Sequence, residues 1–355
     1  MSPSTTALAL CVAIALSFVS PAAHACAPAP RQGDFVSIAD EEALIIWDEK
    51  QKLQHFIRRA EFRTPAKDFG FLVPTPTQPT LGEVSDDLFQ RLERRVAPEV
   101  KYVKKRALQF GCMMLGAADK SAAVAGGVQV LDSQRVAGLD ATVLAADSAD
   151  ALADWLKKHD YDHSPELSKW LEPYIAKQWK VTAFKLAQGE TPKPRLASKA
   201  VRMTFTAERP FFPYREPESQ RTGAAASGPR KLRTYLLASA RMQGALAVAG
   251  GFPGKTKFAR PIFDAARVVE DPALVGAVGD SPWLTMIEDT ASPRPGVDDV
   301  FFGVATDRSE VVPAPVVVTE RVPVVIPIEL LPVGLVLLVI VGGVVLFVRR
   351  RKSAP

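Results

Sequence analysis

The hydrophobic pattern divides the chain into two apolar ends and a long middle in which apolar and polar positions alternate. At the start, residues 7–19 form an uninterrupted apolar run that Pro21 ends. Small residues then occupy the positions that a signal peptidase reads, and the run is too short to span a bilayer. The pattern predicts a signal peptide over residues 1–25, cleaved before Cys26.

The second apolar end, residues 330–348, has 19 residues and is close to the roughly 20 that a membrane-spanning helix requires. Four cations follow at residues 349–352. By the positive-inside rule they place the basic tail, residues 349–355, in the cytoplasm and everything before the helix outside. The letters LPVG at the start of this stretch leave a second interpretation open, a sorting signal that is cut for attachment to a cell wall.

Between the ends, short runs rich in β-branched and aromatic residues are typical of strands. Residues 43–48 and 53–62 flank the polar turn EKQK and predict an antiparallel hairpin. Further strands are predicted at residues 68–74, 100–108, 128–146, 179–187, 200–208 and 232–242.

Three helices are predicted from the helical spacing of apolar residues and from capping signals. The first begins at Ser85, a favourable N-cap residue, and ends before Pro98. The other two lie at residues 148–159 and 164–178, and each begins with a serine cap.

These elements predict an α+β ectodomain, residues 26–308, with mostly antiparallel sheets, a few short helices and one or two subdomains. The next segment, residues 309–329, is rich in Val and Pro. Because this composition favours an extended backbone, we expect a semi-rigid stalk before the membrane helix at residues 330–348.

The formal net charge of +5 is concentrated in the predicted cytoplasmic tail. Removing the four tail cations from the 44 Lys and Arg leaves 40, against 39 Asp and Glu. An ectodomain so balanced has no basic excess that would attract nucleic acid, so no nucleic-acid partner is predicted.

Two cysteines remain in the mature chain, Cys26 and Cys112. An even number in an oxidising compartment favours one disulfide between them. The alternative is lipidation of Cys26 at the new N-terminus, which the small and polar residues before the cleavage site match poorly.

The stretch AGGFPGKT, residues 249–256, is close to the phosphate-binding pattern that ends in Gly-Lys-Thr. A working loop of this kind follows a strand and opens a helix. Pro253 and Pro261 interrupt such a helix, and the predicted topology places Lys255 outside the cytoplasm. We therefore interpret the stretch as a turn with Lys255 exposed, and the sequence predicts no nucleotide and no other cofactor.

The stretch HDYDH, residues 159–163, brings two histidines and two aspartates close together. His159, Asp162 and His163 are weak candidates for metal ligands, because imidazole and carboxylate groups bind zinc. The stretch is also the joint between two predicted helices, where a histidine suits a helix C-terminus. We favour the interpretation that the stretch joins two helices, and no metal site is predicted.

A basic run covers residues 91–106 and contains seven Lys or Arg against two Glu. Such a run could meet anionic lipid or a polyanionic envelope polymer. The alternative is the solvated face of a helix end and a strand, which is the usual role of a charge run.

Four segments of the chain carry a resemblance to a known family. They are DFGFLVPTPTQP…DDLFQRLE (68–93), ALADWLKKHDYDHSPELSKWLEPYIAKQWKVTAFKL (151–186), VRMTFTAERPFFPYRE (201–216) and SPWLTMIEDTASPRPGVDDVFF (281–302). Together they resemble a bacterial envelope family of unknown function, DUF2330. The resemblance implies an exported domain with a signal peptide and, in many members, a C-terminal span; it implies no activity.

The sequence favours a binding function over catalysis, because it contains no Gly-x-Ser-x-Gly elbow and no reactive cysteine context. We expect a single-pass protein of the cell membrane whose ectodomain, in the periplasm or outside the cell, binds another envelope protein or a polymer. The alternative is an exported enzyme, with or without a metal ion, whose site forms only in the fold.

Overall fold

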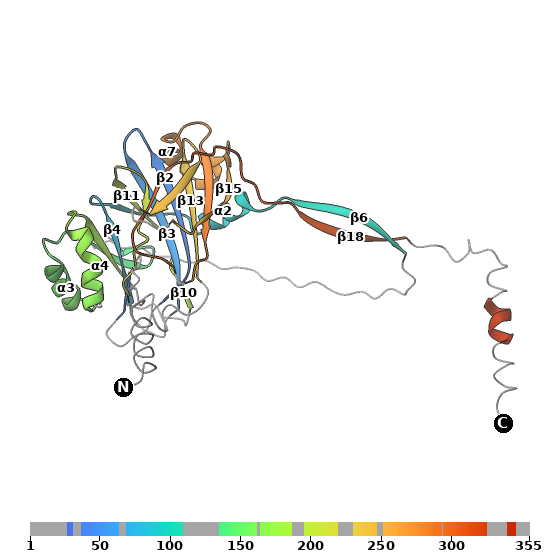
Figure 1. Cartoon of the computed structure of the whole chain (residues 1–355), viewed down its shortest axis with the longest axis horizontal. Coiled ribbons are helices and arrows are strands. Elements are labelled where there is room, and N and C mark those ends of the chain that lie inside the picture. The colour runs from blue at the N-terminus through green and yellow to red at the C-terminus, as the bar shows by residue number, and fades with distance from the viewer. Residues whose placement is uncertain are drawn as a thin grey trace, which may run out of the picture. The chain divides into compact units, whose positions relative to one another are not determined.

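A computed structural model describes ten ranges of the chain, and they form a mixed α+β structure dominated by strands (Figure 1). The predicted α+β class is confirmed in this form. The chain divides into two compact units, one within residues 1–97 and 129–313 and the other within 98–128 and 314–355. The described ranges are residues 27–30, 37–63, 69–108, 135–161, 164–186, 195–218, 230–246, 251–292, 294–324 and 339–345.

An eight-stranded sheet is the centre of the first unit. Its strand order is β15-β16-β13-β2-β3-β11-β5, and β10 pairs with β3. All neighbours are antiparallel except β13 and β2, which are parallel. The strands are β2 (Ser37–Asp48), β3 (Leu53–Arg63), β5 (Thr80–Glu83), β10 (Arg195–Ala197), β11 (Val201–Thr206), β13 (Lys231–Ala238), β15 (Lys255–Pro261) and β16 (Trp283–Asp289).

The predicted hairpin is confirmed as β2 and β3, but β2 begins earlier than predicted, at Ser37. Its first half is polar and has no apolar run to indicate a strand. The pairing with β3 continues through this half, with Glu42 opposite Arg59. Because successive side chains of a strand point to opposite faces, the neighbours Glu41 and Glu42 lie on different sides of the sheet.

One face of the eight-stranded sheet packs against a second sheet of five strands, in the order β1-β4-β9-β8-β7. Aromatic rings connect the two sheets, since Phe62 stacks on Phe71 at 5.5 Å and Phe71 on Phe184 at 4.8 Å. A small sheet, β12-β17-β14, joins the same core. These strands are β1 (Ala27–Pro30), β4 (Phe69–Thr75), β7 (Arg135–Val136), β8 (Leu139–Leu144), β9 (Lys180–Leu186), β12 (Phe211–Phe212), β14 (Met242–Leu246) and β17 (Val300–Val304).

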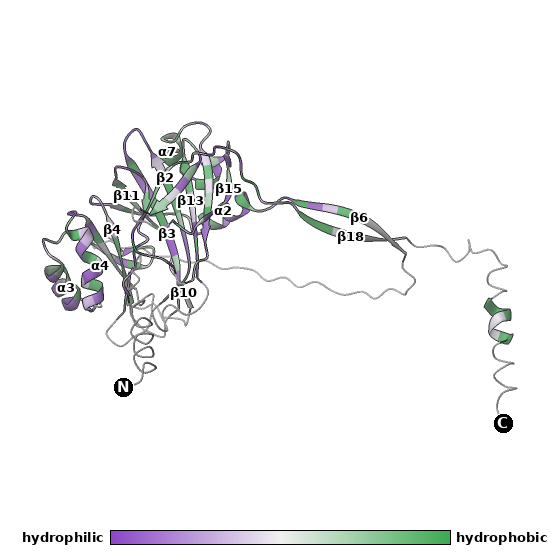
Figure 2. Cartoon of the chain, viewed as in Figure 1, coloured by the Kyte–Doolittle hydropathy of each residue, from purple (hydrophilic) through white to green (hydrophobic). Residues whose placement is uncertain are grey.

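Short helices cover the other face of the eight-stranded sheet: α2 (Leu88–Val96), α6 (Ala265–Val269) and α7 (Pro272–Gly276). They form a second core with Leu44 and Ile46 of β2. Helices α3 (Ala149–Lys158) and α4 (Pro165–Ile175) pack on the five-stranded sheet. Figure 2 shows both hydrophobic and hydrophilic residues along these two helices, as expected for helices with one buried face.

The predicted serine caps of α3 and α4 are confirmed. Ser148 Oγ accepts a hydrogen bond from the amide of Ala151 at 3.1 Å, and Ser164 Oγ accepts one from Leu167 at 3.2 Å. Each bond satisfies a backbone N–H that the first helical turn leaves without a partner.

The predicted start of the helix at Ser85 is wrong. Helix α2 begins at Leu88, and Asp87 occupies the N-cap position without a side-chain capping bond. The Ser85 hydroxyl instead donates to the Asp87 carboxylate, so the two side chains satisfy each other rather than the helix amides. The helix ends before Pro98, as predicted.

The second unit contains a two-stranded parallel ribbon of β6 (Val100–Leu108) and β18 (Val316–Val324). The predicted strand at residues 100–108 is confirmed. Within the segment expected to form a stalk, β18 is extended and hydrogen-bonded to β6. The segment also starts inside the first unit, because Val311 pairs with Ala259 of β15.

In the part of the chain that the structure describes, no helix is long and apolar enough to cross a membrane. Of the span predicted at residues 330–348, the structure describes residues 339–345, and they are helical.

We expect Gly70→Ala to destabilise the first unit by about 1–3 kcal/mol, because overpacking a close-packed core has this effect. A Cβ at Gly70 would lie 2.6 Å from the carbonyl oxygen of Phe184 and would also meet the ring of Tyr161. Urea unfolding measures the difference. Gly303→Ala in β17 is the matched control, since a Cβ there meets no atom within 4 Å. Equal midpoints for the two variants would contradict this packing.

Candidate functional site

The central hairpin carries two adjacent pairs of charged residues, Glu41-Glu42 on β2 and Arg58-Arg59 on β3. Strand alternation separates them into two ion pairs on opposite faces of the sheet. Arg58 Nε donates to Glu41 at 2.6 Å in the core, and Arg59 Nε donates to Glu42 at 2.7 Å on the other face. The first pair belongs to a buried network, and the second lines a surface groove.

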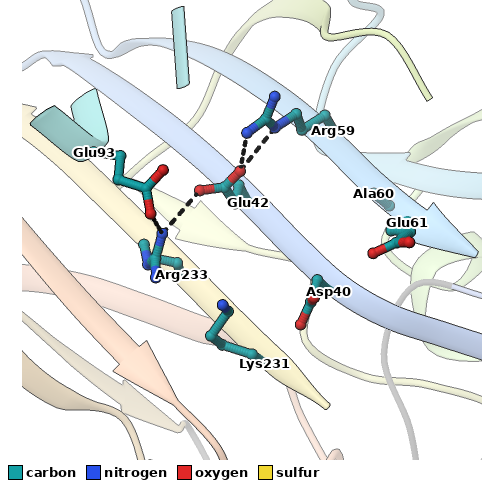
Figure 3. A pocket seen from close by; sticks show the side chains of 8 residues that line it. All are labelled: Asp40, Glu42, Arg59, Ala60, Glu61, Glu93, Lys231 and Arg233. Carbon is teal, nitrogen blue, oxygen red and sulfur yellow. Dashed lines mark hydrogen bonds and ion pairs between the residues drawn. The ribbon is translucent and has the colours of Figure 1, made fainter. Parts of the chain in front are cut away.

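The groove is open and has a volume of about 410 Å³ (Figure 3). It lies on the sheet face that α2 covers, beyond the apolar contacts of that helix. All of its lining residues except one alanine are charged. They are Asp40, Glu42, Arg59, Ala60, Glu61, Glu93, Lys231 and Arg233.

Two cations of the groove are held by neighbouring carboxylates. Arg233 Nη1 lies 3.3 Å from an oxygen of Glu42 and 3.3 Å from an oxygen of Glu93 on α2. Arg59 pairs with Glu42 and also lies over the ring of Phe89, 4.9 Å from its centroid. These contacts fix the upper part of the groove shown in Figure 3.

Asp40 and Lys231 differ from the other charged residues of the groove. They are direct partners in the register of the parallel strands β2 and β13, and both are half-buried. Among the described residues, neither side chain has a hydrogen bond or an ion pair (Figure 3). A carboxylate and an ammonium group are therefore available side by side on rigid strands.

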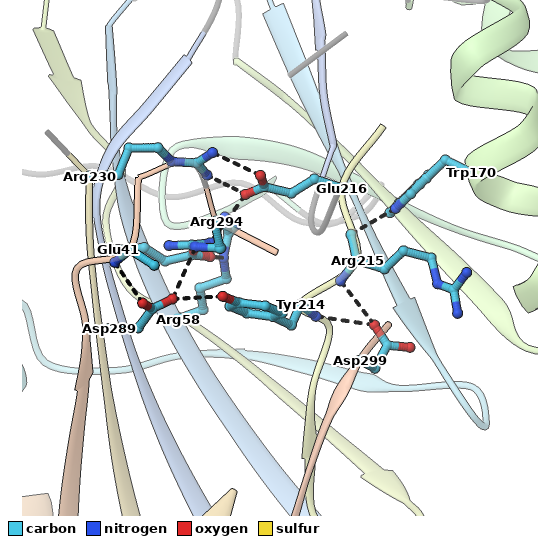
Figure 4. A network of polar contacts seen from close by, with 11 residues as sticks. Glu41, Arg58, Trp170, Tyr214, Arg215, Glu216, Arg230, Asp289, Arg294 and Asp299 are labelled. Carbon is cyan, nitrogen blue, oxygen red and sulfur yellow. Dashed lines mark hydrogen bonds and ion pairs between the residues drawn. The ribbon is translucent and has the colours of Figure 1, made fainter. Parts of the chain in front are cut away.

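On the opposite face of the hairpin, Arg294 is the centre of a buried ion network (Figure 4). Its guanidinium lies 3.1 Å from Glu216, 3.4 Å from Asp289 and 3.7 Å from Glu41. Arg294 is only 4% exposed, so these contacts take place away from water. Arg58 pairs with Glu41 and completes the contact to the hairpin.

The charges of this network balance, because Arg58, Arg230 and Arg294 face three carboxylates. Arg230 makes a bidentate pair with Glu216. Burial alone raises the pKa of Glu41, but the nearby Arg58 and Arg294 outweigh it and hold the pKa below its usual value. The carboxylate is therefore ionised at neutral pH, which the balanced pairing requires.

The segment FFPYRE, residues 211–216, connects this network to helix α4 (Figure 4). Tyr214 donates its hydroxyl to Asp289 at 2.8 Å and its backbone amide to Asp299 at 3.1 Å. Tyr174 of α4 donates to the same oxygen of Asp299 at 2.9 Å. Burial is the main cause that raises the pKa of Asp299 to about 6, although the hydrogen bonds from Tyr174 and from the Arg215 amide lower it.

The family model described as "Uncharacterized protein conserved in bacteria (DUF2330)" matches residues 20–297. The chain belongs to this family. The match covers both strands of the central hairpin and every residue of the groove, so the site lies within the DUF2330 domain.

No curated protein matches the sequence of this DUF2330 member. Among solved structures, the chain is similar to the crystal structure of baculovirus P35, with a TM-score of 0.39 and 8% sequence identity. The similarity covers 77% of this chain and 98% of the other. At this level of similarity it supports no inference about fold or function.

The residues proposed from sequence as metal ligands are only partly described. His159 caps the C-terminus of α3, where its Nδ1 lies 2.7 Å from the Trp155 carbonyl oxygen and its ring stacks on that tryptophan. Asp162 and His163 lie outside the described residues. Within the described ranges, no group of three or more His, Cys, Asp or Glu side chains could hold a metal ion.

The other sequence candidates lie apart from the groove. Lys255 is exposed and begins strand β15, whereas a phosphate-binding loop leads into a helix. Cys26 and Cys112, the predicted disulfide, lie outside the described residues. The basic run divides between two elements: its first three cations, Arg91, Arg94 and Arg95, belong to α2, and the other four belong to β6.

The sequence pattern did not predict the groove or the network, although it contains one signal for part of them. The four-residue turn of the predicted hairpin sets a register in which Glu42 lies opposite Arg59. Extending the predicted strand 43–48 by two residues in that register places the two charged dipeptides on paired strands. Glu216 and Arg294 come from distant segments, and no local pattern connects them to the hairpin.

We expect Arg294→Met to reduce the free energy of unfolding by about 3–5 kcal/mol, because it leaves buried carboxylates without their cation. Chemical denaturation of the purified protein measures this loss. Arg260→Met is the control, since its pair with Glu310 is about half exposed and such pairs contribute about 0–1 kcal/mol. Similar losses for both variants would show that the network does not stabilise the fold.

Asp299 predicts a specific pH dependence of stability. Its folded pKa of about 6 lies above the unfolded value of 3.8, so its contribution to stability is complete below pH 3.8 and is lost as the pH rises through 6. Asp299→Asn keeps an acceptor oxygen but cannot titrate. We expect the unfolding free energy of the native protein to fall relative to the variant between about pH 4 and 7, by up to about 3 kcal/mol. Parallel pH curves would contradict the shifted pKa.

Proposed function

We propose that this DUF2330 protein is an exported binding module of the bacterial envelope, anchored to the cell membrane by one C-terminal span. The signal-peptide pattern at residues 1–25 and the apolar stretch at residues 330–348 support the export and the anchor. In this proposal the charged groove on the eight-stranded sheet is the ligand-binding site.

The observation that carries the proposal is the pair Asp40 and Lys231. Both are half-buried, both line the groove, and neither has a partner among the described residues. A partly desolvated charge is stabilised when a ligand supplies the opposite charge, and such charge-assisted hydrogen bonds are the strong ones. A ligand that carries both an ammonium and a carboxylate group satisfies both residues at once.

The surroundings of this pair suit recognition by a rigid surface. Glu42 holds Arg59 and Arg233, so these side chains are already ordered before a ligand arrives. Preorganised groups lose little conformational entropy on binding. The groove is open rather than enclosed, so it admits a short peptide of an envelope protein or polymer that carries both charges.

Saturation-transfer NMR with the dipeptide alanyl-alanine tests this function on the full chain in nanodiscs. We expect a signal from the free dipeptide and none from the form that is acetylated and amidated at its ends. Lys231→Met and Asp40→Asn should each weaken binding by about tenfold, because each removes one charged contact.

The matched control is Lys199→Met with Asp86→Asn. These residues form an ion pair at 3.8 Å, and both side chains are more than 60% exposed. Their loss should leave dipeptide binding unchanged. Equal signals from the free and the capped dipeptide, or equal effects of the groove and control variants, would refute the groove as the binding site.

A further inference from the structure

The ribbon of β6 and β18 exposes apolar side chains that the described part of the second unit does not cover. Tyr102 is 71% exposed, and Val317 is 60% exposed. A two-stranded ribbon with no packed face is marginally stable in water, and contiguous exposed apolar residues mark interaction sites. Figure 2 shows hydrophobic residues along β18 and hydrophilic residues on β6.

The register of the ribbon gathers apolar groups on one face. Val316 is paired with Val100, and Val318 is paired with Tyr102. Partners in a parallel pair point to the same side, so these four side chains form one patch. Each of them is at least 41% exposed.

The ribbon is also strongly basic. Its two strands contain five Lys or Arg and one Glu in their sequences. Lys101 and Lys104 are exposed, and Lys104 has no ion pair within the described residues. Valine, tyrosine and lysine together on a surface are typical of a segment that lies at a membrane interface, where aromatic rings and cations meet headgroups.

Two other cations of the basic run, on helix α2, are already bound within the first unit. Arg91 donates to the carbonyl oxygen of Val268 at 2.8 Å, and Arg95 pairs with Asp264 at 3.0 Å. These arginines hold α2 to helix α6 and to Asp264, its N-cap residue. The exposed cations of the run that have no ion pair within the described residues are therefore Arg94 on α2 and Lys104 on the ribbon.

The position of the ribbon in the chain indicates which partner it meets. Strand β18 ends at Val324, and the predicted span begins at residue 330. The five residues between them reach at most about 20 Å when fully extended. With the anchor of the proposed function in place, the basic ribbon lies close to the outer membrane–water interface.

We propose that the ribbon binds the outer surface of the membrane that anchors the chain and recognises anionic phospholipid headgroups. Lys104, which lies on the same face as Tyr102, meets the phosphates, while Tyr102 and the valines of that face enter the boundary between headgroups and acyl chains. Lys101 points to the other face and adds positive charge near the same surface. This proposal rests on the anchor but not on the groove.

The test compares the full chain in nanodiscs of phosphatidylcholine with nanodiscs that also contain phosphatidylglycerol. Hydrogen–deuterium exchange is measured for peptides that cover residues 100–104 and 316–320. We expect about tenfold slower exchange of both segments in the anionic discs, since each lysine near such a surface contributes to binding. If the chain does not remain with either disc, the membrane anchor itself is contradicted. That result is distinct from equal exchange in the two discs, which contradicts only binding of the ribbon to anionic lipid.

The double variant Lys101→Glu, Lys104→Glu should lose the protection. The double variant Lys157→Glu, Lys158→Glu changes the charge equally at exposed positions of α3 and should keep it. Equal exchange in the two discs would overturn the proposal. So would protection by soluble polyphosphate without anionic lipid, which indicates a polymer partner, or protection that depends on protein concentration, which indicates a second copy of the chain.

Discussion

The contacts of Arg294 with three buried carboxylates are the interaction on which the first unit depends. They connect the hairpin at Glu41, strand β16 at Asp289 and the segment 211–216 at Glu216. Taking these charges out of water is unfavourable, and only nearly complete pairing offsets it. The three guanidinium groups of the network supply that pairing, and their planar donors suit two carboxylates at once. These elements come from distant parts of the chain. The network therefore fixes their positions relative to one another.

The same strands that carry the network present the groove on their other face. A strand that turns Glu41 into the core must turn Glu42 outward, and the same holds for Arg58 and Arg59. The packed core thus sets the positions of the groove residues and keeps the strands that carry them rigid. Lys231 extends this surface onto β13, because the parallel register places it beside Asp40.

Local rules predicted much of the fold and little of the site. The hairpin and the caps at Ser148 and Ser164 follow from turn and capping chemistry, which act over a few residues. The start of β2 was missed because it has no apolar run, and its residues Glu41 and Glu42 are satisfied by Arg58 and Arg59 on the neighbouring strand. The start of α2 was wrong because Ser85 bonds with Asp87 instead of a helix amide. The ion network joins residues far apart in sequence, and only the tertiary structure brings them together.

The most direct test of ligand binding at the groove is site-specific photo-crosslinking in intact cells. A photoreactive residue replaces Glu93, which lines the groove and whose side chain is 61% exposed. We predict a crosslink to an envelope peptide or polymer that disappears when Lys231→Met is added. The same replacement at Glu172, exposed on α4, should give no such product. A crosslink that persists with Lys231→Met, or that forms equally at Glu172, would contradict binding at the groove.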